Sequence, residues 1–370
     1  MEILKETSMD LQKIAKEFML LEAASGYEKK MAYAMKDQLS VYSDDVCIDK
    51  AGNVIAKFEG TNSLSHTIMV FAHIDQLGFI IRKIEEDGLI QIDRLGGIPE
   101  KVLPALNISI SNIDGEYIPG VIGVKSHHVT PPEEKYKVDT VTNLFVDVGA
   151  SSRAQVVEAG IHVGCPAIYK PSFTNLMGNR ICGTAVDNRC GCTALVAIAE
   201  QLAQNKHEST IYIVGTVWEE FNLRGAIIAS RKIHPDISIC LDVTMTGDTP
   251  ELKSKFDIGL GRGPAVGLYN FHSRGTLNGT IAHHGLYRLA LETAKRNSIN
   301  LQEFSTIGML TDAAYVQLEE SYVASIDMGF PARYTHTPVE SADLDDIASL
   351  SNLVTAMVCS ITPDFNVSRF

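Results

Sequence analysis

Apolar residues recur at helical spacing at the start of the chain. Leu11, Ile14 and Phe18 lie three and four positions apart, which predicts an amphipathic helix over residues 10–23. The turn residues Ser25-Gly26 end this helix. The same reasoning predicts, before residue 77, a helix at 27–39, a hairpin of strands at 46–48 and 54–58, and a buried strand at 67–72.

Between residues 77 and 169 short strand-like runs dominate, separated by Gly, Pro and Asp. Strands are predicted at 79–84, 89–95, 108–111, 118–124, 144–148 and 167–169, with one helix at 153–159. Many short strands with turn signals favour a small β-barrel or sandwich.

After residue 169 helical and strand-like segments alternate. Helices are predicted at 191–203, 225–230, 278–295, 312–318 and 344–361, and strands at 210–217, 237–243, 301–305 and 322–328. Such alternation implies a mostly parallel sheet covered by helices. We therefore predict an α/β domain, residues 1–76 and 170–370, interrupted by a β domain, residues 77–169.

Composition narrows the class of protein. The 370 residues are 45% hydrophobic and 21% charged, which is ordinary for a globular protein. A net charge of −13 and the lack of basic runs disfavour nucleic-acid binding. No apolar run reaches the roughly 18 residues of a membrane span, and residues 1–21 do not resemble a signal peptide. Seven cysteines without C-x-x-C spacing indicate reduced thiols and a cytoplasmic location.

Two adjacent acids, Glu219 and Glu220, follow the buried strand-like run 211–214. Burying two carboxylates is costly unless a cation or hydrogen bonds compensate them, and a metal site is one solution.

Other metal-capable residues also follow strand-like runs, where functional groups collect in open α/β sheets. Each alone has a simpler explanation: a lone His is more often a core or surface residue, and an Asp before a helix is often a cap. Together, imidazole and carboxylate ligands suit Zn²⁺, Co²⁺ or Mn²⁺. The candidate set is His73, Asp187, Glu219, Glu220, Asp242 and His336.

Asp75 lies two positions after His73, so both side chains face the same way if the strand continues. Asp75 can then accept the second ring N–H of His73 and fix the orientation of the ring.

The order of these motifs resembles the M42 family of metallo-aminopeptidases, which includes glutamyl and deblocking aminopeptidases and proteins that carry an endoglucanase label. The similarity spans nearly the whole chain. The matching stretches are Ala72-His73-Ile74-Asp75-Gln76-Leu77-Gly78, Ala185-Val186-Asp187-Asn188-Arg189, Glu219-Glu220, Leu223-Arg224-Gly225, Leu241-Asp242-Val243, Thr311-Asp312-Ala313 and Arg333-Tyr334-Thr335-His336-Thr337-Pro338.

The resemblance implies a three-layer α/β sandwich of the zinc-exopeptidase type with an inserted β-barrel that serves dimerisation. It also implies two divalent ions per chain, with Zn²⁺ or Co²⁺ favoured and Mn²⁺ an option. One ion corresponds to His73 and Asp242, and the other to Glu220 and His336. Asp187 corresponds to the bridging ligand, after which the peptide bond is often cis.

By the same resemblance Glu219 is the general base and Asp75 orients His73. A base that takes a proton from water must not be chelated. Adjacent strand residues point apart, which is compatible with Glu220 on a metal and Glu219 on the water. For Arg224, substrate binding and support of the loop remain equal alternatives.

Three positions depart from the family pattern: Gln76 replaces Glu, Trp218 replaces Gln, and Phe221-Asn222 replaces Val-Gly. None removes a predicted ligand, and each can change substrate preference or activity.

We predict a cytoplasmic, dinuclear metal-dependent aminopeptidase that acts on peptides. The family implies a hollow tetrahedral dodecamer built from dimers. One alternative is a glycoside hydrolase, which needs two free carboxylates. The other is a catalytically altered metal-binding or scaffold protein, an alternative that Gln76 and Trp218 keep open.

Overall fold

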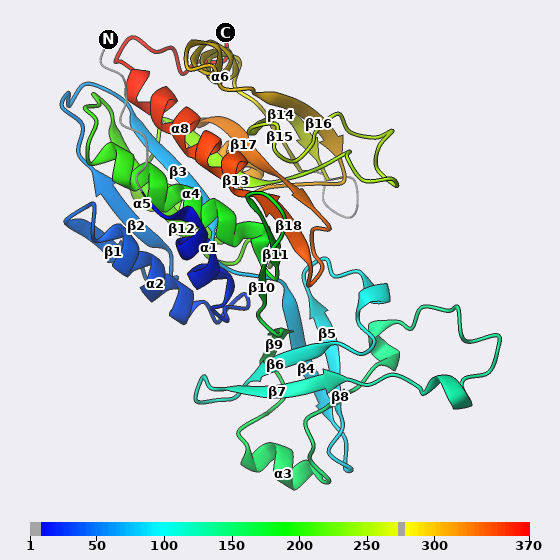
Figure 1. Cartoon of the computed structure of the whole chain (residues 1–370). Coiled ribbons are helices and arrows are strands. Elements are labelled where there is room, and N and C mark those ends of the chain that lie inside the picture. Colours follow the sequence, from blue (N-terminus) through cyan, green and yellow to red (C-terminus); the bar gives the residue numbers. More distant parts are fainter. Residues whose placement is uncertain (1–8, 273–277) are drawn as a thin grey trace.

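The computed structural model describes residues 9–272 and 278–370, which form a larger α/β body and a smaller β body (Figure 1). The larger body contains a 12-stranded sheet. Its main strand order is β1 (Asp45–Ile48), β2 (Val54–Phe58), β12 (Thr210–Thr216), β3 (Thr67–His73), β13 (Ile237–Met245), β17 (Ala324–Arg333), β18 (Glu340–Asp343), β11 (Arg180–Gly183) and β10 (Phe173–Asn175). Three further strands extend the sheet from β17: β14 (Ala265–Phe271) pairs with β17, and β15 (Gly279–Ile281) and β16 (Gln302–Ile307) pair with β14.

Helices cover both faces of this sheet because its inner strands are apolar on both faces. In β3, Ile68, Val70 and Ala72 pack into one core, while Met69 and Phe71 pack into another. The first core is closed by α1 (Leu11–Met19), α2 (Lys29–Leu39), α4 (Val186–Leu202), α6 (His284–Arg296) and α8 (Leu344–Ser360). The second is closed by α5 (Gly225–Ile233) and α7 (Ala313–Val316).

The prediction of a mostly parallel sheet is wrong. The inner strands β12, β3, β13 and β17 are parallel, and β16 pairs with β14 in the same sense. The other pairings are antiparallel. The alternation of helices and strands detected the inner strands but missed β10, β11, β14 and β18, of which only β10 lies at an edge of the sheet.

The helix predicted over 278–295 is wrong at its start. Residues 279–281 form β15, which pairs with β14, and α6 begins only at His284. The ring of His283 caps this helix, because its Nδ1 accepts from the main-chain N–H of Leu286 at 3.3 Å. Asn278 therefore directly precedes a strand that begins at Gly279, and the helical spacing of apolar residues applies only after residue 283. The hairpin of β1 and β2 is confirmed.

Between β3 and β10 the chain forms the smaller body, whose six strands follow the closed order β4-β5-β8-β7-β6-β9. Its interior is apolar, with Phe79, Ile92 and Ile110 fully buried. Its elements are β4 (Gly78–Ile84), β5 (Ile90–Leu95), η1 (Glu100–Val102), β6 (Asn107–Ser111), β7 (Tyr117–Ile122), η2 (His127–Val129), η3 (Val141–Asn143), β8 (Val146–Asp147), α3 (Arg153–Glu158) and β9 (Pro166–Tyr169).

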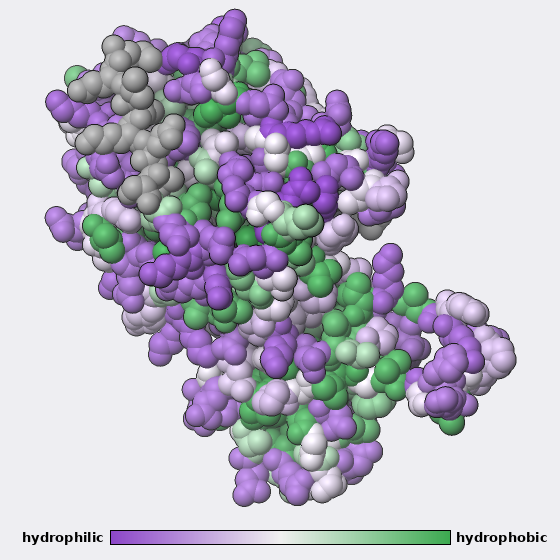
Figure 2. Space-filling model, viewed as in Figure 1, coloured by the Kyte–Doolittle hydropathy of each residue, from purple (hydrophilic) through white to green (hydrophobic). Residues whose placement is uncertain are grey.

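The surface of the larger body is mainly hydrophilic in the view of Figure 2, and hydrophobic residues gather over the smaller body and near the junction of the two. Among the described residues, no helix combines the length and hydrophobicity that a membrane crossing requires.

Candidate active site

All six predicted metal-capable residues line one cavity of about 680 Å³. β3 ends at His73 and β13 carries Asp242, so the parallel register brings two of them to the same edge of the sheet. The others come from the turn after β12, the start of α4, and the loop between β17 and β18. The cavity therefore forms where the carboxyl ends of the inner strands meet, as expected for an α/β sheet.

Asp187 lies between two histidine rings. Its Oδ1 is 3.1 Å from Nε2 of His73, and its Oδ2 is 3.5 Å from Nε2 of His336. Nε2 of His73 is also 3.9 Å from Oδ1 of Asp242. A carboxylate whose two oxygens face different imidazoles has the geometry of a bridging ligand. The peptide bond between Asp187 and Asn188 is cis, as the family resemblance implies.

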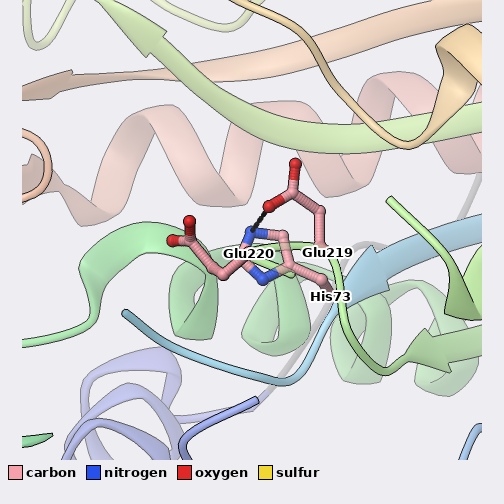
Figure 3. A group of neighbouring side chains, drawn as sticks. All are labelled: His73, Glu219 and Glu220. Carbon is pink, nitrogen blue, oxygen red and sulfur yellow. Dashed lines mark ion pairs between the residues drawn. The ribbon is translucent and has the colours of Figure 1, made fainter. Parts of the chain in front are cut away.

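Three overlapping groups place their ligand atoms within 4.8 Å of one another. They are His73 with Asp187 and Asp242, Asp187 with Glu220 and His336, and His73 with Glu219 and Glu220. Figure 3 shows the last group: the carboxylate of Glu219 approaches the ring of His73, and that of Glu220 extends to the other side. Oε2 of Glu219 lies 3.9 Å from Nε2 of His73.

Both imidazoles are oriented by the ring nitrogen that faces away from the cluster. Nδ1 of His73 lies 3.1 Å from the main-chain oxygen of Asp75, and Nδ1 of His336 lies 2.9 Å from that of Gly97. In each ring Nδ1 can donate to these oxygens, which leaves Nε2 as an acceptor for a cation. The rings are thus arranged as metal ligands commonly are.

Asp75 also organises the turn that carries the paired acids. Its carboxylate lies 3.5 Å from Nδ1 of His73 and accepts from Oγ of Ser25 at 2.6 Å. It further accepts from the main-chain N–H groups of Glu219 at 3.0 Å and Glu220 at 3.1 Å. Burial alone would raise the pKa of Asp75, but these hydrogen bonds and the His73 ring lower it. Asp75 thereby holds His73 and both glutamates together.

Glu219 and Glu220 do not lie in a strand, so the reason predicted for their divergence is wrong. β12 ends at Thr216, and the turn that follows has left-handed backbone at Trp218, Asn222 and Leu223. The main-chain turn therefore separates the two carboxylates.

Asn53 and Gly225 fix this turn at its base. Oδ1 of Asn53 accepts from the main-chain N–H of Val217 at 3.0 Å, and its Nδ2 donates to the main-chain oxygen of Gly225 at 3.1 Å. A Cβ at Gly225 would lie 2.0 Å from the oxygen of Val217, so the close approach requires glycine. Asn53 lies in the connection between the two predicted hairpin strands, and nothing in the local pattern of the sequence indicates this role.

The cavity concentrates more negative charge than its surroundings compensate. Burial raises the pKa of Glu219 well above its usual range; His73 opposes this rise, and Glu220 adds to it. Burial likewise raises the pKa of Glu220 to about 7 and that of Asp242 well above its ordinary value. Oε1 of Glu220 is buried and has no hydrogen-bond partner among the described residues. A bound cation would relieve both the repulsion and this unpaired oxygen, so the residues present fit divalent metal ions.

The histidines complement these acids. Burial alone would lower the pKa of His73, but Glu219 and Asp187 raise it well above the ordinary value. The same opposition acts on His336, where Glu220 and Asp187 outweigh burial.

Two of the positions that depart from the family pattern lie outside the cavity lining. Gln76 accepts from Nη2 of the fully buried Arg189 at 2.9 Å and from the main-chain N–H of Ala23 at 3.3 Å. Trp218 packs against the core of the larger body. Of the Phe221-Asn222 pair, only Asn222 lines the cavity, so it is the departure that a substrate would meet directly.

Arg224 is not brought to the cavity. Arg224 is exposed, and its guanidinium lies over the ring of Phe221. Cζ of Arg224 is 5.1 Å from the ring centroid. The predicted contact with substrate remains a prediction, and the observed contact favours support of the loop.

Glu340 was not identified from the sequence, although it contacts two of the predicted ligands. Its carboxylate accepts from the main-chain N–H groups of Asp187 and His336. The available signal was a single acid at the start of the short segment Glu340-Ser341-Ala342, which does not predict a partner 153 positions away.

Comparison with known proteins gives a consistent assignment. The family model described as M42 glutamyl aminopeptidase matches residues 52–353. Lysyl aminopeptidase from Pyrococcus furiosus is 35% identical over 343 residues, covering 92% of this chain and 94% of the relative.

Two solved structures resemble the whole chain. An aminopeptidase from Desulfurococcus kamchatkensis has a TM-score of 0.89 at 33% identity, covering 96% of each chain. TET1 peptidase from Pyrococcus horikoshii, described as able to assemble into a tetrahedron or a large octahedral shell, has a TM-score of 0.84 at 25% identity and covers 95% of this chain and 100% of that chain.

The resemblance inferred from the motifs is therefore confirmed, and the match extends over most of the chain. The mixed α/β fold agrees with these aminopeptidase structures. The protein is an aminopeptidase, a hydrolase that acts on peptide bonds, and the chain belongs to the M42 glutamyl aminopeptidase family.

Proposed function

We propose that the protein removes N-terminal residues from peptides with two divalent metal ions bound in the cavity. The observation that carries this proposal is the position of Asp187, whose two oxygens face His73 at 3.1 Å and His336 at 3.5 Å. His73 and Asp242 would hold one ion, Glu220 and His336 the other, and Asp187 both. The donor set suits Zn²⁺ or Co²⁺, and it accepts Mn²⁺.

Bound divalent ions would acidify water and polarise the scissile carbonyl. Glu219 is the base: it accepts a proton from the attacking water as the oxygen adds to the carbonyl carbon, and it delivers that proton to the leaving amine as the C–N bond breaks. Its position beside His73 supports both transfers. Asp75 keeps the base in place through the main chain of residue 219.

A glycoside hydrolase is disfavoured by the same geometry. Such an enzyme needs two carboxylates free for acid and base chemistry. In this cavity Asp187, Glu219, Glu220 and Asp242 all belong to groups that converge on a histidine.

We further propose that residues 77–169 form an inserted β-barrel domain that mediates dimerisation, and that residues 1–76 and 170–370 form the catalytic domain. The closed strand order supports the barrel. The segment around η2 extends away from it (Figure 1), and Val129 and Tyr136 there are 70% and 95% exposed. Apolar side chains on a projecting segment are suited to packing against another subunit.

The TET1 peptidase supports a further step, assembly into a dodecamer that would admit only short or unfolded peptides. We place the protein in the cytoplasm, because its seven cysteines are all free in the structure.

Hydrolysis of aminoacyl-nitroanilides and free-amine peptides tests the activity, with metal-free, Zn²⁺-loaded and Co²⁺-loaded protein. N-acetylated peptides and glucans serve as control substrates. Glu219→Gln is expected to retain both ions and to lower kcat by about 10²- to 10⁴-fold. Two bound ions per chain without release from any free-amine substrate would refute peptide cleavage, and full activity in Glu219→Gln would refute its role as the base.

A further inference from the structure

Glu340 is a buried carboxylate that the proposed reaction does not use. It is 1% exposed and begins β18, where its register partner on β11 is Gly183. Four residues after Gly183 the chain reaches Asp187, and four residues before Glu340 it carries His336. The pairing of β11 with β18 therefore inserts Glu340 between two segments that are far apart in the sequence.

The two oxygens of Glu340 serve different segments. Oε2 accepts from the main-chain N–H of Asp187 at 3.0 Å, and Oε1 accepts from the main-chain N–H of His336 at 2.5 Å. One side chain thus ties together the main chains of two proposed ligands.

The loop that carries His336 needs such a restraint. Tyr334 and His336 have φ values of +60° and +65°, a left-handed conformation that non-glycine residues rarely adopt. Backbone of this kind persists where surrounding contacts determine it. The ring of His336 is held separately, by the main-chain oxygen of Gly97, so Glu340 is the acceptor for the main chain.

We propose that Glu340 is a positioning residue of the metal centre, which fixes the main chains of Asp187 and His336 and thereby sets the separation of their ligand atoms. The separation concerned is the 3.5 Å between Oδ2 of Asp187 and Nε2 of His336. This inference rests on the proposed function, because it presumes that those two atoms hold a metal ion.

A purely structural role makes a different prediction. Glu340 satisfies one of the first N–H groups of α4, whose cap residue, Ala185, offers no side-chain acceptor. If capping were its whole role, its loss would lower stability without changing metal affinity.

Glu340→Gln separates the two roles, because the amide retains one acceptor oxygen and turns an NH₂ group toward the other N–H. We expect the apparent dissociation constant for Co²⁺ to rise about 10- to 100-fold at the site of Asp187, Glu220 and His336. Calorimetric titration of the metal-free protein measures it, and excess Co²⁺ is expected to restore most of the peptidase activity.

Asp343→Asn provides the matched control. Asp343 ends the same strand, is buried, accepts from the main-chain N–H of Asp345 at 3.1 Å and pairs with Arg180 at 3.3 Å, away from the cavity. It is expected to lower thermal stability and leave the Co²⁺ affinity unchanged. Dependence on His336 is tested by repeating Glu340→Gln in a His336→Ala background, where its effect on affinity should disappear.

An affinity of Glu340→Gln within twofold of the parent would overturn the proposal, whatever happens to thermal stability. If that variant does not fold, Glu340→Asp replaces it under the same criterion, since a side chain one methylene shorter cannot keep both contacts. Failure of the proposed function is distinguishable, because the parent protein itself would then bind no metal pair or cleave no peptide.

Discussion

In the smaller body, β4 and β5 place Phe79 and Ile92 inside and leave Arg82 and Lys83 in solvent. In the larger body, β3 and β13 are buried along almost their whole length on both faces. A strand with one solvent-exposed face can carry charged side chains anywhere along that face, as in the exposed ion pair of Arg82 with Asp93. A strand buried on both faces can carry a charged group only where a partner compensates it, as Asp242 in β13 faces His73.

This difference explains where the chemistry gathers. The members of all three metal-capable groups among the described residues lie in the carboxyl-terminal halves of β3 and β13, in the loops that follow β12 and β17, or at the start of α4, and none lies in the smaller body. The smaller body contributes a wall instead: Gly97 and Ile98 line the cavity, and Gly97 orients the ring of His336. One body therefore supplies the reactive groups, and the other shapes the space beside them.

The sharpest test of this division removes an equal aromatic side chain from each body. Phe79→Ala and Phe71→Ala each delete a fully buried ring, from β4 and β3 respectively. Each is expected to lower the free energy of unfolding by about 3–5 kcal/mol. Only Phe71→Ala should also weaken metal binding, because β3 ends at His73.

Urea unfolding and metal analysis of the folded variants measure both effects. Equal loss of metal in the two variants would show that metal binding does not depend on the larger body more than on the smaller one. Leu64→Ala, at an exposed position, controls for effects of mutation itself.

The charge at the sheet edge predicts a pH dependence for the metal-free protein. Glu220 has a pKa of about 7 and Glu340 of about 8 in the folded state, against 4.5 ordinarily. Between the ordinary pKa of 4.5 and these raised values, the folded state retains protons that the unfolded state has lost, so the free energy of unfolding falls as pH rises. The raised pKa values of His73 and His336 act in the same direction, since their stabilising contribution is lost as pH rises through the folded pKa.

We therefore expect the unfolding free energy of metal-free protein to fall from about pH 5 to about pH 8. Saturating Zn²⁺ should stabilise the protein most at the upper end of this range. Thermal unfolding with and without the metal, at several pH values, checks the trend. A metal-free protein whose stability rises over this interval would contradict the charge distribution described for the cavity.

The smallest expected effect concerns the contact between the two bodies. The hydroxyl of Tyr169, at the end of β9, donates to the main-chain oxygen of His336 at 3.4 Å. Tyr169→Phe removes only this long hydrogen bond, so we expect a loss below about 1 kcal/mol in unfolding free energy and below about fivefold in Co²⁺ affinity. Calorimetry measures both quantities. A larger loss of affinity would mean that the smaller body positions His336 through Tyr169 as well as through Gly97.

Several features were predictable from local pattern. The final helix, predicted at 344–361, is α8 at Leu344–Ser360, and the strand before His73 is β3. The six metal-capable residues were identified because each follows a strand-like run or a turn, and all six line one cavity. Local spacing reports which positions are buried and where a strand ends, and these are the quantities that placed the candidate residues.

Other structural features depended on strand pairing and hydrogen bonds between distant segments. β15 looked helical because 278–283 adjoins a true helix, and only hydrogen bonding to β14 makes it a strand. The divergence of Glu219 from Glu220 comes from a turn pinned by Asp75 and Asn53, not from strand geometry.

By itself, the sequence determined the chemical types of the candidate ligands, their places near the ends of strand-like runs and the family. The tertiary structure alone decided which oxygen of Asp187 faces which histidine, and that Glu340 joins Asp187 to His336. The physical reason is that burial periodicity is a local property of the chain, whereas these contacts depend on strand register between segments more than a hundred residues apart.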